Sequence, residues 1–507
     1  MATRVARAFS RRFFLDTRSL AAFRIGLGLI LVADAVLRCR DFRLMFTPEG
    51  MFPHDALHAF SPSAANWSLA FLLDATWWDG LILGLEGVAG IMLAAGFQTR
   101  LAVIIAWVAL VSVVRRTAPA TNAGDLWLTT LLLWGGFLPL GSRWSLDAAR
   151  RHQPCSESHF SVASVALTLQ ILVVYLAAGL SKCNATWLSG TAVRDALSVH
   201  DHGTPLGAWL VQLPAVAKLA GAAVLSLELA GPVLFLLLPW PRLRGAIALS
   251  FLTFHGLVGL LMSVGLFAAI GIAAWLALVP GVVWDQLSGL MPTRRSTAAF
   301  ARARNAPARG AFCEALKAAA NAACVCLLVL AAADATVRLL PWQPPLPAAI
   351  QTAIDLACLR QDWEMFGTVL QQEQWTYARG LLADGSEVDL LRDGQPLERE
   401  RPGGGFTSLP HHRWHKLLWV LPKPPMRVFS PSIAGALAAD WNANHPPEKQ
   451  LRRLEICFAR LTATSSSGVT EPGVLHELVV ATWPPRNATG AGNLDRWLDE
   501  HGEQADQ

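Results

Sequence analysis

The sequence predicts an all-α polytopic membrane domain of about nine helices, followed by a small extracytoplasmic α+β domain. Of its 507 residues, 53% are hydrophobic and 16% are charged, and the mean hydropathy is +0.38, far from an ordinary soluble domain. Trp outnumbers Tyr by 20 to 2, and many Trp stand near the ends of apolar runs, as membrane-interface anchors do. Polarity rises after about residue 340, so we divide the chain into a membrane domain at 1–340 and a C-terminal domain at 341–507.

The apolar runs have lengths near the roughly 20 residues that a helix needs to cross ~30 Å of hydrocarbon. We expect spans near 19–37, 78–97, 101–116, 125–141, 160–181, 212–238, 244–262, 264–287 and 314–339. Several Arg residues precede the first run, which is too long and too richly followed by others for a cleaved signal peptide. The first span is therefore expected to stay, with the N-terminus in the cytoplasm.

Arg residues in short loops predict the orientation, because such loops stay on the cytoplasmic side. Nine spans place the Arg-rich loops at 143–152, 242–244 and 294–309 inside. The Arg residues at 38–43 and 115–116 do not fit this orientation, because they fall in outer loops. Everything after about Pro341 then lies outside a plasma (inner) membrane. The net charge of +5 reflects these loops, so we expect membrane lipid and no nucleic acid as a partner.

The C-terminal domain carries strand and helix patterns. WTYARGLL and EVDLL flank a turn at 383–386, the helix-like ALAADWNANH follows, and RRLEICFARL and HELVVATW read as further strands. In an oxidising compartment, Cys358 and Cys457 are expected to be disulfide-bonded, to each other or to Cys39 or Cys183.

Lys182 stands at the end of the apolar run 160–181, where a charged side chain is costly unless it is paired, hydrated or used. Tyr175 lies two helical turns earlier on the same face, and Ala178 and Gly179 leave space beside the amine. A partly desolvated lysine becomes a base near neutral pH. The alternative is that Lys182 snorkels to the lipid headgroups.

Other polar residues fall within the spans. A helix rise of ~1.5 Å per residue places His255 ~12 Å below the outer end of its span, with Asn122 and Asp125 also on the outer side. His255 is either a hydrogen-bonded core histidine or part of an outer-facing pocket with Lys182. Arg24, Glu86 and Glu228 lie deeper in the membrane, and we expect Arg24 to form a structural ion pair with one of the two glutamates. No Walker, dinucleotide or zinc-spacing motif occurs, and no metal is expected.

Several stretches, in order and spacing, resemble the horizontally transferred transmembrane (HTTM) family, which includes the vitamin K-dependent gamma-glutamyl carboxylases. They are SLAAFRIGLGLILVADAVLR (19–38), MFTPEGMFP (45–53), TNAGDLWLTTLLLWGGFLPLGSRWSLDAA (121–149), AGLSKCNATWLSG (178–190), LELAGP (227–232), TFHGLVGLLMSVGLF (253–267) and QDWEMFGT (361–368). Together they cover most of 15–385. By this resemblance, the chain looks like a bacterial homologue of the carboxylases.

The resemblance implies a membrane enzyme that opens to the outer side and uses reduced vitamin K or menaquinol. In the carboxylases, the lysine of AG-x-x-K-x-x-x-x-W-x-x-G deprotonates the hydroquinone, and Lys182 occupies that place. Oxygenation of the quinol then yields a strong base that removes a glutamate γ-proton, so that carbon dioxide can add. The histidine of the FH motif, here His255, lies near that pocket. We assign catalysis to Lys182 and His255, and quinol binding to Asn122, Asp125, Tyr175 and Trp187.

One departure bears on the activity. The animal carboxylases have Asn-Asn-His where this chain has Thr121-Asn122-Ala123, and that histidine serves the glutamate half of the reaction. Two hypotheses follow. The first is a quinol-dependent oxygenase or carboxylase with Lys182 as its base. The second is a non-enzymatic membrane scaffold, or a maturation or export partner of a secreted peptide or protein.

Overall fold

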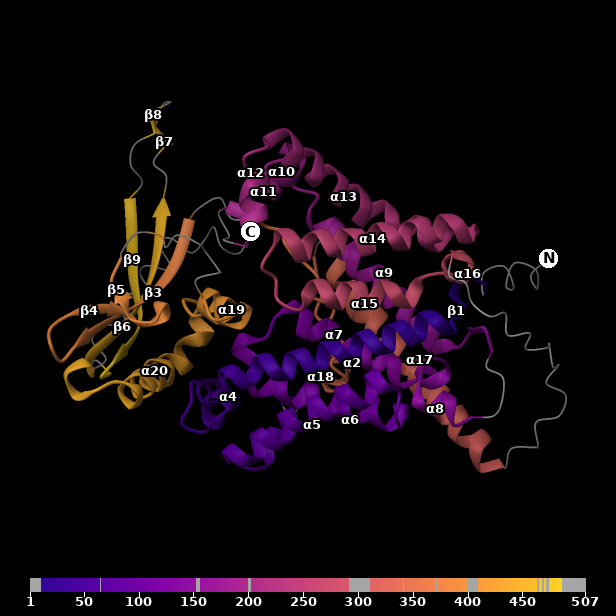
Figure 1. The fold of residues 1–507 in the computed structure, drawn as a ribbon, viewed down its shortest axis with the longest axis horizontal. Helices are drawn as coiled ribbons and strands as arrows, with labels where there is room; N and C mark the ends of the chain where they lie inside the picture. Colours follow the sequence, from indigo (N-terminus) through magenta and orange to yellow (C-terminus); the bar gives the residue numbers. More distant parts are fainter. Residues whose placement is uncertain are drawn as a thin grey trace.

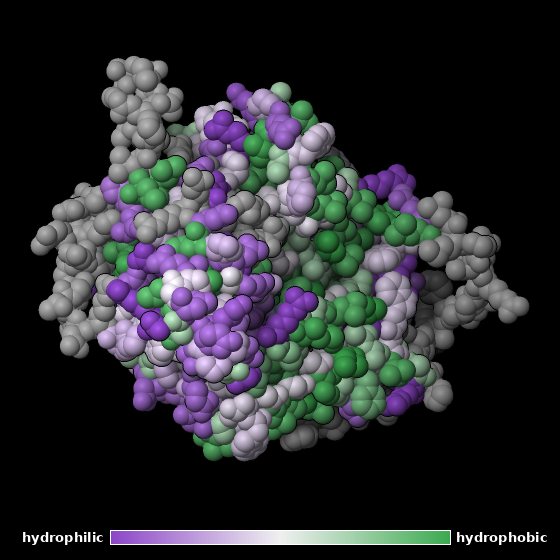
Figure 2. Space-filling model, turned by 60° about the vertical axis from the view of Figure 1, so that its left-hand side comes forward, coloured by the Kyte–Doolittle hydropathy of each residue, from purple (hydrophilic) through white to green (hydrophobic). Residues whose placement is uncertain are grey.

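The fold has a helical part and a sheet domain at one end of it (Figure 1). The computed structural model describes residues 11–63, 65–151, 156–198, 202–290, 311–340, 342–369, 373–398, 401, 409–462, 465–466, 469–470 and 474–485. Most long helices lie side by side with roughly parallel axes, and α19 lies between them and the sheet. Hydrophilic residues gather on the sheet domain and hydrophobic residues on the helices beside it (Figure 2).

All nine expected membrane segments are helical. The long helices are α2 (Thr17–Arg40), α5 (Thr76–Ala95), α6 (Thr99–Arg116), α7 (Ala123–Gly136), α9 (Val162–Ser181), α13 (Pro214–Leu237), α14 (Pro241–Leu261), α15 (Phe267–Leu278), α16 (Gly281–Leu290) and α17 (Ala311–Leu339). Their ends follow local signals: the Asp16 side chain caps α2, Ser161 and Ser164 form a capping box at α9, and Gly96 ends α5 at a φ of 68°.

Among the described residues, fewer helices than the expected nine are, by length and composition, able to cross a membrane on their own. In the described part of the chain, six helices are long and apolar enough to cross a membrane, or seven if α15 and α16, bent by 93°, count as one span. Helix α6 carries Arg100, Arg115 and Arg116, and α7 has only 14 residues. An apolar run predicts burial, but it does not separate a lipid-spanning helix from one shielded inside the bundle.

Short elements connect these helices. They are η1 (Arg11–Phe13), β1 (Leu15–Asp16), α3 (Phe42–Met45), α4 (His54–Phe60), η2 (Leu69–Leu72), η3 (Ala118–Ala120), η4 (Leu140–Ser142), α8 (Leu146–Ala149), β2 (Ser158–His159), α10 (Ala185–Ser189), α11 (Ala192–Ser198), α12 (Pro205–Val211) and α18 (Ala348–Leu356). Strands β1 and β2 pair as a short antiparallel ribbon. Helices α10, α11 and α12 fill the connection between α9 and α13, which the sequence left without predicted structure.

The C-terminal domain is an antiparallel five-stranded sheet in the order β5-β4-β3-β6-β9, covered by helix α20. Its elements are β3 (Glu373–Leu382), β4 (Glu387–Asp389), η5 (Leu390–Arg392), β5 (Gln395–Pro396), α19 (His412–Val420), η7 (Pro424–Phe429), α20 (Ser430–Asn444), η8 (Pro447–Lys449), β6 (Leu451–Thr462), β7 (Ser465–Ser466), β8 (Val469–Thr470) and β9 (Val474–Trp483). The strands and the helix expected from the sequence are confirmed, including the turn at Gly385, which has a φ of 88°.

Residues that follow the expected boundary at 341 pack into the helical part of the molecule. Ile354, Leu359 and Trp363 are buried in the same hydrophobic core as α2, α7 and α9. The sheet begins only at Glu373. Residues 348–369 therefore belong with the membrane helices, because their apolar side chains complete the core of the bundle.

The expected disulfides are not present in the structure. Cys39, Cys183, Cys358 and Cys457 are all free thiols. Cys457 is buried in the sheet, whereas Cys358 packs at the end of α6, where its Sγ lies 3.2 Å from Nη2 of Arg115. The prediction was wrong because cysteine count and compartment do not bring two thiols together.

Candidate functional site

The central feature of the site is a buried ion pair between Lys182, at the end of α9, and Glu228 on α13. The Lys182 Nζ atom lies 2.8 Å from Oε2 of Glu228 and donates to the carbonyl of Ala178 at 3.2 Å. Lys182 is 3% exposed and Glu228 is 4% exposed. The amine therefore turns back along its own helix into the bundle, which excludes the snorkelling interpretation.

Glu228 reaches Lys182 because α9 and α13 approach closely. A Cβ on Gly179 would lie 3.1 Å from the carbonyl carbon and Cβ of Glu228, so a side chain there would push α13 away. Pro232, one turn after Glu228, has no N–H to bond the Glu228 carbonyl, which loosens the α13 ladder beside the pair. The space that Ala178 and Gly179 leave is thus filled by a carboxylate.

His255 has a different partner. Its Nε2 atom lies 2.5 Å from the hydroxyl of Tyr175. Tyr175 precedes Lys182 by seven residues on α9. The His255 Nδ1 atom is buried and has no hydrogen-bond partner among the described residues. On α15, a Cβ at Gly271 would lie 2.2 Å from the His255 ring, so the imidazole rests directly on that helix.

Aromatic rings surround this Tyr175–His255 pair. Trp127 comes from α7, Phe251 from α14, and Phe267 and Trp275 from α15. The Phe251 and Trp275 rings stack with centroids 4.0 Å apart, and Trp127 is 5.8 Å from Tyr175. Flat apolar walls with a few buried polar atoms are the usual lining of a site for a planar, hydrophobic molecule.

A segment without helix or strand, residues 361–369, covers the end of α9. The carbonyl of Gly367 accepts from the Asn184 side chain at 2.8 Å, and the carbonyl of Phe366 accepts from Nε1 of Trp187 at 2.8 Å. The Trp187 ring centroid lies 5.4 Å from the Lys182 Nζ. The predicted site residue Trp187 is therefore part of the cover over the ion pair. The sequence marked this segment only through its resemblance.

Deeper in the bundle, Gln361 of this segment bonds to the middle of α9. Its Oε1 atom accepts from Nε2 of Gln170 at 2.7 Å and from Nε1 of Trp363 at 2.7 Å. The backbone N–H of Gln361 donates to Asp334 on α17 at 2.5 Å. These bonds satisfy polar groups that would otherwise be costly inside the membrane, and they fix the segment between α9 and α17.

Asn122 and Asp125 have structural partners at the start of α7. They form a capping box, in which the Asn122 side chain accepts from the backbone N–H of Asp125 and Asp125 accepts from that of Asn122. Asp125 also binds Arg38 at 3.1 Å and Arg413 at 2.8 Å. These contacts do not involve Lys182 or His255, and the assignment of Asn122 and Asp125 to quinol binding stays a prediction.

Arg413 belongs to α19, so the C-terminal domain contributes a side chain to the membrane part. Together with Asp34, Arg38 and Asp125 it forms a buried cluster of two cations and two anions. Although burial alone would lower the pKa of Arg413, the carboxylates of Asp125 and Asp34 raise it. Burial, with the Arg413 charge beside it, lowers the pKa of His412 to about 4.

The expected ion pair of Arg24 was wrong. Its Nη2 atom donates to the carbonyl of Trp144 at 2.6 Å, and it packs against the turn at Gly96 that ends α5. Glu86 is fully buried, and no ion pair joins it to Arg24 in the described part of the chain. Helical side chains point toward the N-terminus of their helix, which carries the Arg24 guanidinium away from both glutamates.

The described residues do not suggest a metal site. Among them, no group of three or more His, Cys, Asp or Glu side chains is arranged to hold an ion. The Lys182–Glu228 pair and the Tyr175–His255 pair both meet at α9, which carries Tyr175 and ends at Lys182.

Comparison with known proteins gives one match. The family model described as the HTTM domain matches residues 14–281, more than half of the chain. The matched range contains both partners of the Lys182–Glu228 pair and of the Tyr175–His255 pair. No curated protein and no solved structure matches the chain.

Proposed function

The chain belongs to the HTTM family, a membrane-associated family related to carboxylases, and from this premise we propose that it is a quinol-using membrane enzyme. In this proposal, Lys182 accepts a proton from a quinol hydroxyl at a pocket that faces the outer side of the membrane. The observation that carries the proposal is the buried ion pair, whose Nζ and Oε2 atoms are 2.8 Å apart.

The pair supplies a way to obtain a neutral amine. An ammonium cannot accept a proton, and an ion pair in water would keep it charged. Burial disfavours both charged forms, so moving one proton from the Lys182 Nζ to the Glu228 Oε2 gives an amine and a carboxylic acid at little cost. The amine then accepts the proton of a bound hydroxyl. Glu228 is thus a positioning residue that stores the displaced proton.

The residues present fit a quinol. The aromatic residues around Tyr175 and His255 are of the type that packs on a flat ring, and the buried Nδ1 of His255, which has no hydrogen-bond partner among the described residues, offers one polar contact. When bound, the quinol supplies the acidic hydroxyl and the electrons for reaction with oxygen. Trp187, Phe366 and Gly367 shield the amine from water, which keeps the proton transfer within the site.

Carboxylation of glutamate is outside this proposal. Ala123 stands where the animal carboxylases have a histidine for that half-reaction, and a methyl group cannot move a proton. The proposal therefore ends at quinol deprotonation and oxygenation.

The test uses the full chain in lipid nanodiscs, supplied with reduced vitamin K or menaquinol and oxygen, with the epoxide measured by chromatography. Lys182→Ala should abolish the product. Lys182→Arg should fail equally, because guanidinium stays protonated. The matched control is Lys218→Ala, which removes an exposed lysine from α13. Activity in Lys182→Arg, or no epoxide from the unaltered chain with either quinol, would refute the proposal.

One observation favours the second hypothesis, a maturation partner of a secreted peptide. Strand β9 is an edge of the described sheet, and Leu475 and Val479 on it are exposed. Such an edge can accept an extended peptide as an added strand. Under this alternative, a Pro substitution at an outward-facing β9 position would block peptide capture, while Lys182→Ala would leave it unchanged.

A further inference from the structure

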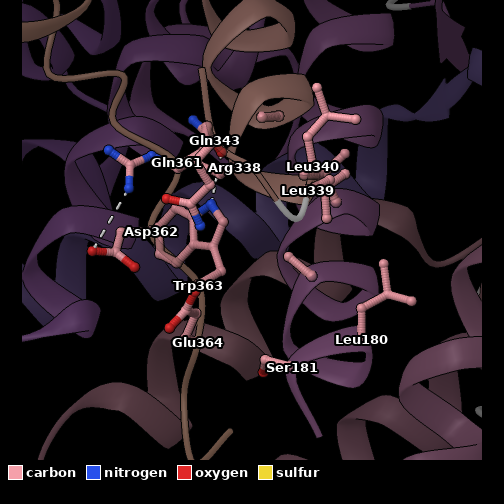
Figure 3. A pocket seen from close by; sticks show the side chains of 13 residues that line it. Leu180, Ser181, Arg338, Leu339, Leu340, Gln343, Gln361, Asp362, Trp363 and Glu364 are labelled. Atoms are coloured by element: carbon pink, nitrogen blue, oxygen red, sulfur yellow. Dashed lines mark hydrogen bonds and ion pairs between the residues drawn. The ribbon is translucent and has the colours of Figure 1, made fainter. Parts of the chain in front are cut away.

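A groove opens on the side of α9 that faces away from Glu228. It lies between α9, the end of α17 and the extended segment 361–364, and its volume is about 220 Å³. In Figure 3, Leu180 and Ser181 line one side, Leu339 and Leu340 lie beside them, and Asp362, Trp363 and Glu364 lie opposite.

The helical walls of this groove are apolar. Val173, Ala177 and Leu180 recur every three to four residues and therefore line one face of α9. Ala335 and Leu339 face them from α17. Only 11% of the apolar window of α17 is buried, so this helix has lipid as its main neighbour and the groove lies at the lipid surface.

The remaining wall is polar and acidic. Along the extended segment, Gln361 and Trp363 point inward and are buried, whereas Asp362 and Glu364 alternate with them and are exposed. Arg338 is the basic residue of the lining; its guanidinium lies 3.0 Å from Asp334 and 4.0 Å from Asp362. Asp362 and Glu364 are the two carboxylates of the lining and Arg338 is its one guanidinium, so the lining has an excess of negative charge.

We propose that the groove binds a phospholipid whose headgroup carries an ammonium, such as phosphatidylethanolamine. The ammonium lies against Asp362 and Glu364, the phosphate lies on the exposed part of Arg338, and an acyl chain follows Val173, Ala177 and Leu180. An anionic headgroup such as phosphatidylglycerol would meet the acidic rim and be repelled. This site is separate from the Lys182–Glu228 pair and does not depend on the proposed function.

Purified, delipidated full-length protein should be titrated with phosphatidylethanolamine, phosphatidylglycerol or phosphatidylcholine, and the bound lipid measured by native mass spectrometry. Phosphatidylethanolamine should bind about tenfold more tightly than phosphatidylglycerol, as expected for two partly exposed charge pairs. The double variant Asp362→Asn/Glu364→Gln should remove this preference. The control Glu387→Gln/Glu448→Gln, which neutralises two exposed acids of the sheet domain, should keep it.

A second variant, Ala177→Trp, tests the groove itself. Its indole would occupy the space of the acyl chain, so binding of each lipid should fall, and a thermal melt confirms that the variant folds. Equal binding of phosphatidylglycerol and phosphatidylethanolamine would refute the headgroup assignment. Unchanged lipid binding by Ala177→Trp, or displacement of the lipid by stoichiometric menaquinone, would refute the groove as a phospholipid site.

Discussion

Arg413 binds Asp125 through two parallel hydrogen bonds, from Nη1 to Oδ2 and from Nη2 to Oδ1, both 2.8 Å long. Arg413 lies on α19 of the C-terminal domain, and Asp125 lies at the start of α7 in the helical part. The two residues are separated by 288 positions in the chain, and both are buried. This bidentate contact, extended by Asp34 and Arg38, holds the two parts of the molecule together.

Removal of the Arg413 charge should separate these two parts. Arg413→Met leaves Asp34 and Asp125 buried with only Arg38, and unpaired buried charges cost about 3 to 5 kcal/mol. Arg413→Lys should not restore the loss, because an ammonium cannot form the bidentate contact. Limited proteolysis should cut between residues 398 and 411 faster in both variants. Arg452→Met, at an exposed position of β6, serves as control, and equal protection of all three variants would contradict the prediction.

The Lys182–Glu228 pair allows stability and activity to be separated. Lys182→Met or Glu228→Leu alone should lower the free energy of unfolding by about 3 to 5 kcal/mol, because each leaves one buried charge. The double variant should recover most of this stability and still form no epoxide. Unfolding is measured by denaturant titration in detergent micelles. Additive losses in the double variant would show that the two side chains are not coupled.

The docking of α19 should weaken in acid because of His412. Its ring packs on the backbone of Gly265, near Arg413, His411, Asp125 and Asp34. The unfolded chain takes up a proton below pH 6.5, whereas the folded chain takes it up only near pH 4. Stability from the neutral ring is therefore fully present above pH 6.5 and is lost as the pH falls to about 4.

This loss amounts to about 3 kcal/mol at most, from ~1.4 kcal/mol per pKa unit. His412→Gln should melt at a temperature that depends less on pH between 7 and 4.5 than that of the unaltered chain. Because the neighbouring carboxylates titrate in both proteins, the difference between the two melting curves is the measured quantity. Parallel curves would exclude His412 as a contributor.

Gly271 should not tolerate a side chain. A Cβ there would meet the His255 ring at 2.2 Å, so Gly271→Ala should displace the imidazole from Tyr175 and cost about 1 to 3 kcal/mol. Gly84→Ala on α5 is the matched control, because a Cβ at Gly84 meets no atom within 4 Å. Thermal melting of both variants tests this, and an equal effect of the two substitutions would argue against the close contact.

The orientation in the membrane is tested with a membrane-impermeant thiol reagent on whole cells, in a cysteine-free background. Ser386→Cys lies in the exposed turn between β3 and β4 and should be labelled. Arg302→Cys, in the Arg-rich loop outside the described residues, should be labelled only after lysis, because such loops stay in the cytoplasm. Labelling in the opposite pattern would reverse the topology and place the site on the inner side.

Hydropathy predicted where helices form, and alternation predicted β3, β4, β6 and β9, because both signals are local. Partners are not local. Lys182 stands at the end of its apolar run, but its side chain turns back one helical turn to Ala178 and so reaches Glu228. Segment 361–369 is too short and too polar to read as part of a membrane core. Arg413 carried no signal at all, since a charged residue in an amphipathic helix usually faces water.

The threading of Gln361 between α9 and α17 has a consequence for biogenesis. The helices enter the membrane in the order of their synthesis, but the peptide that closes their core follows α17 and, in the proposed topology, arrives from the far side of the membrane. Until that peptide has been translocated, Gln170 lacks its hydrogen bond to Gln361 and the segment does not yet pack against α9. In that topology, the last step of assembly would take place away from the ribosome. A chain interrupted before residue 361 would leave an inserted but unfinished bundle for quality-control proteases to remove.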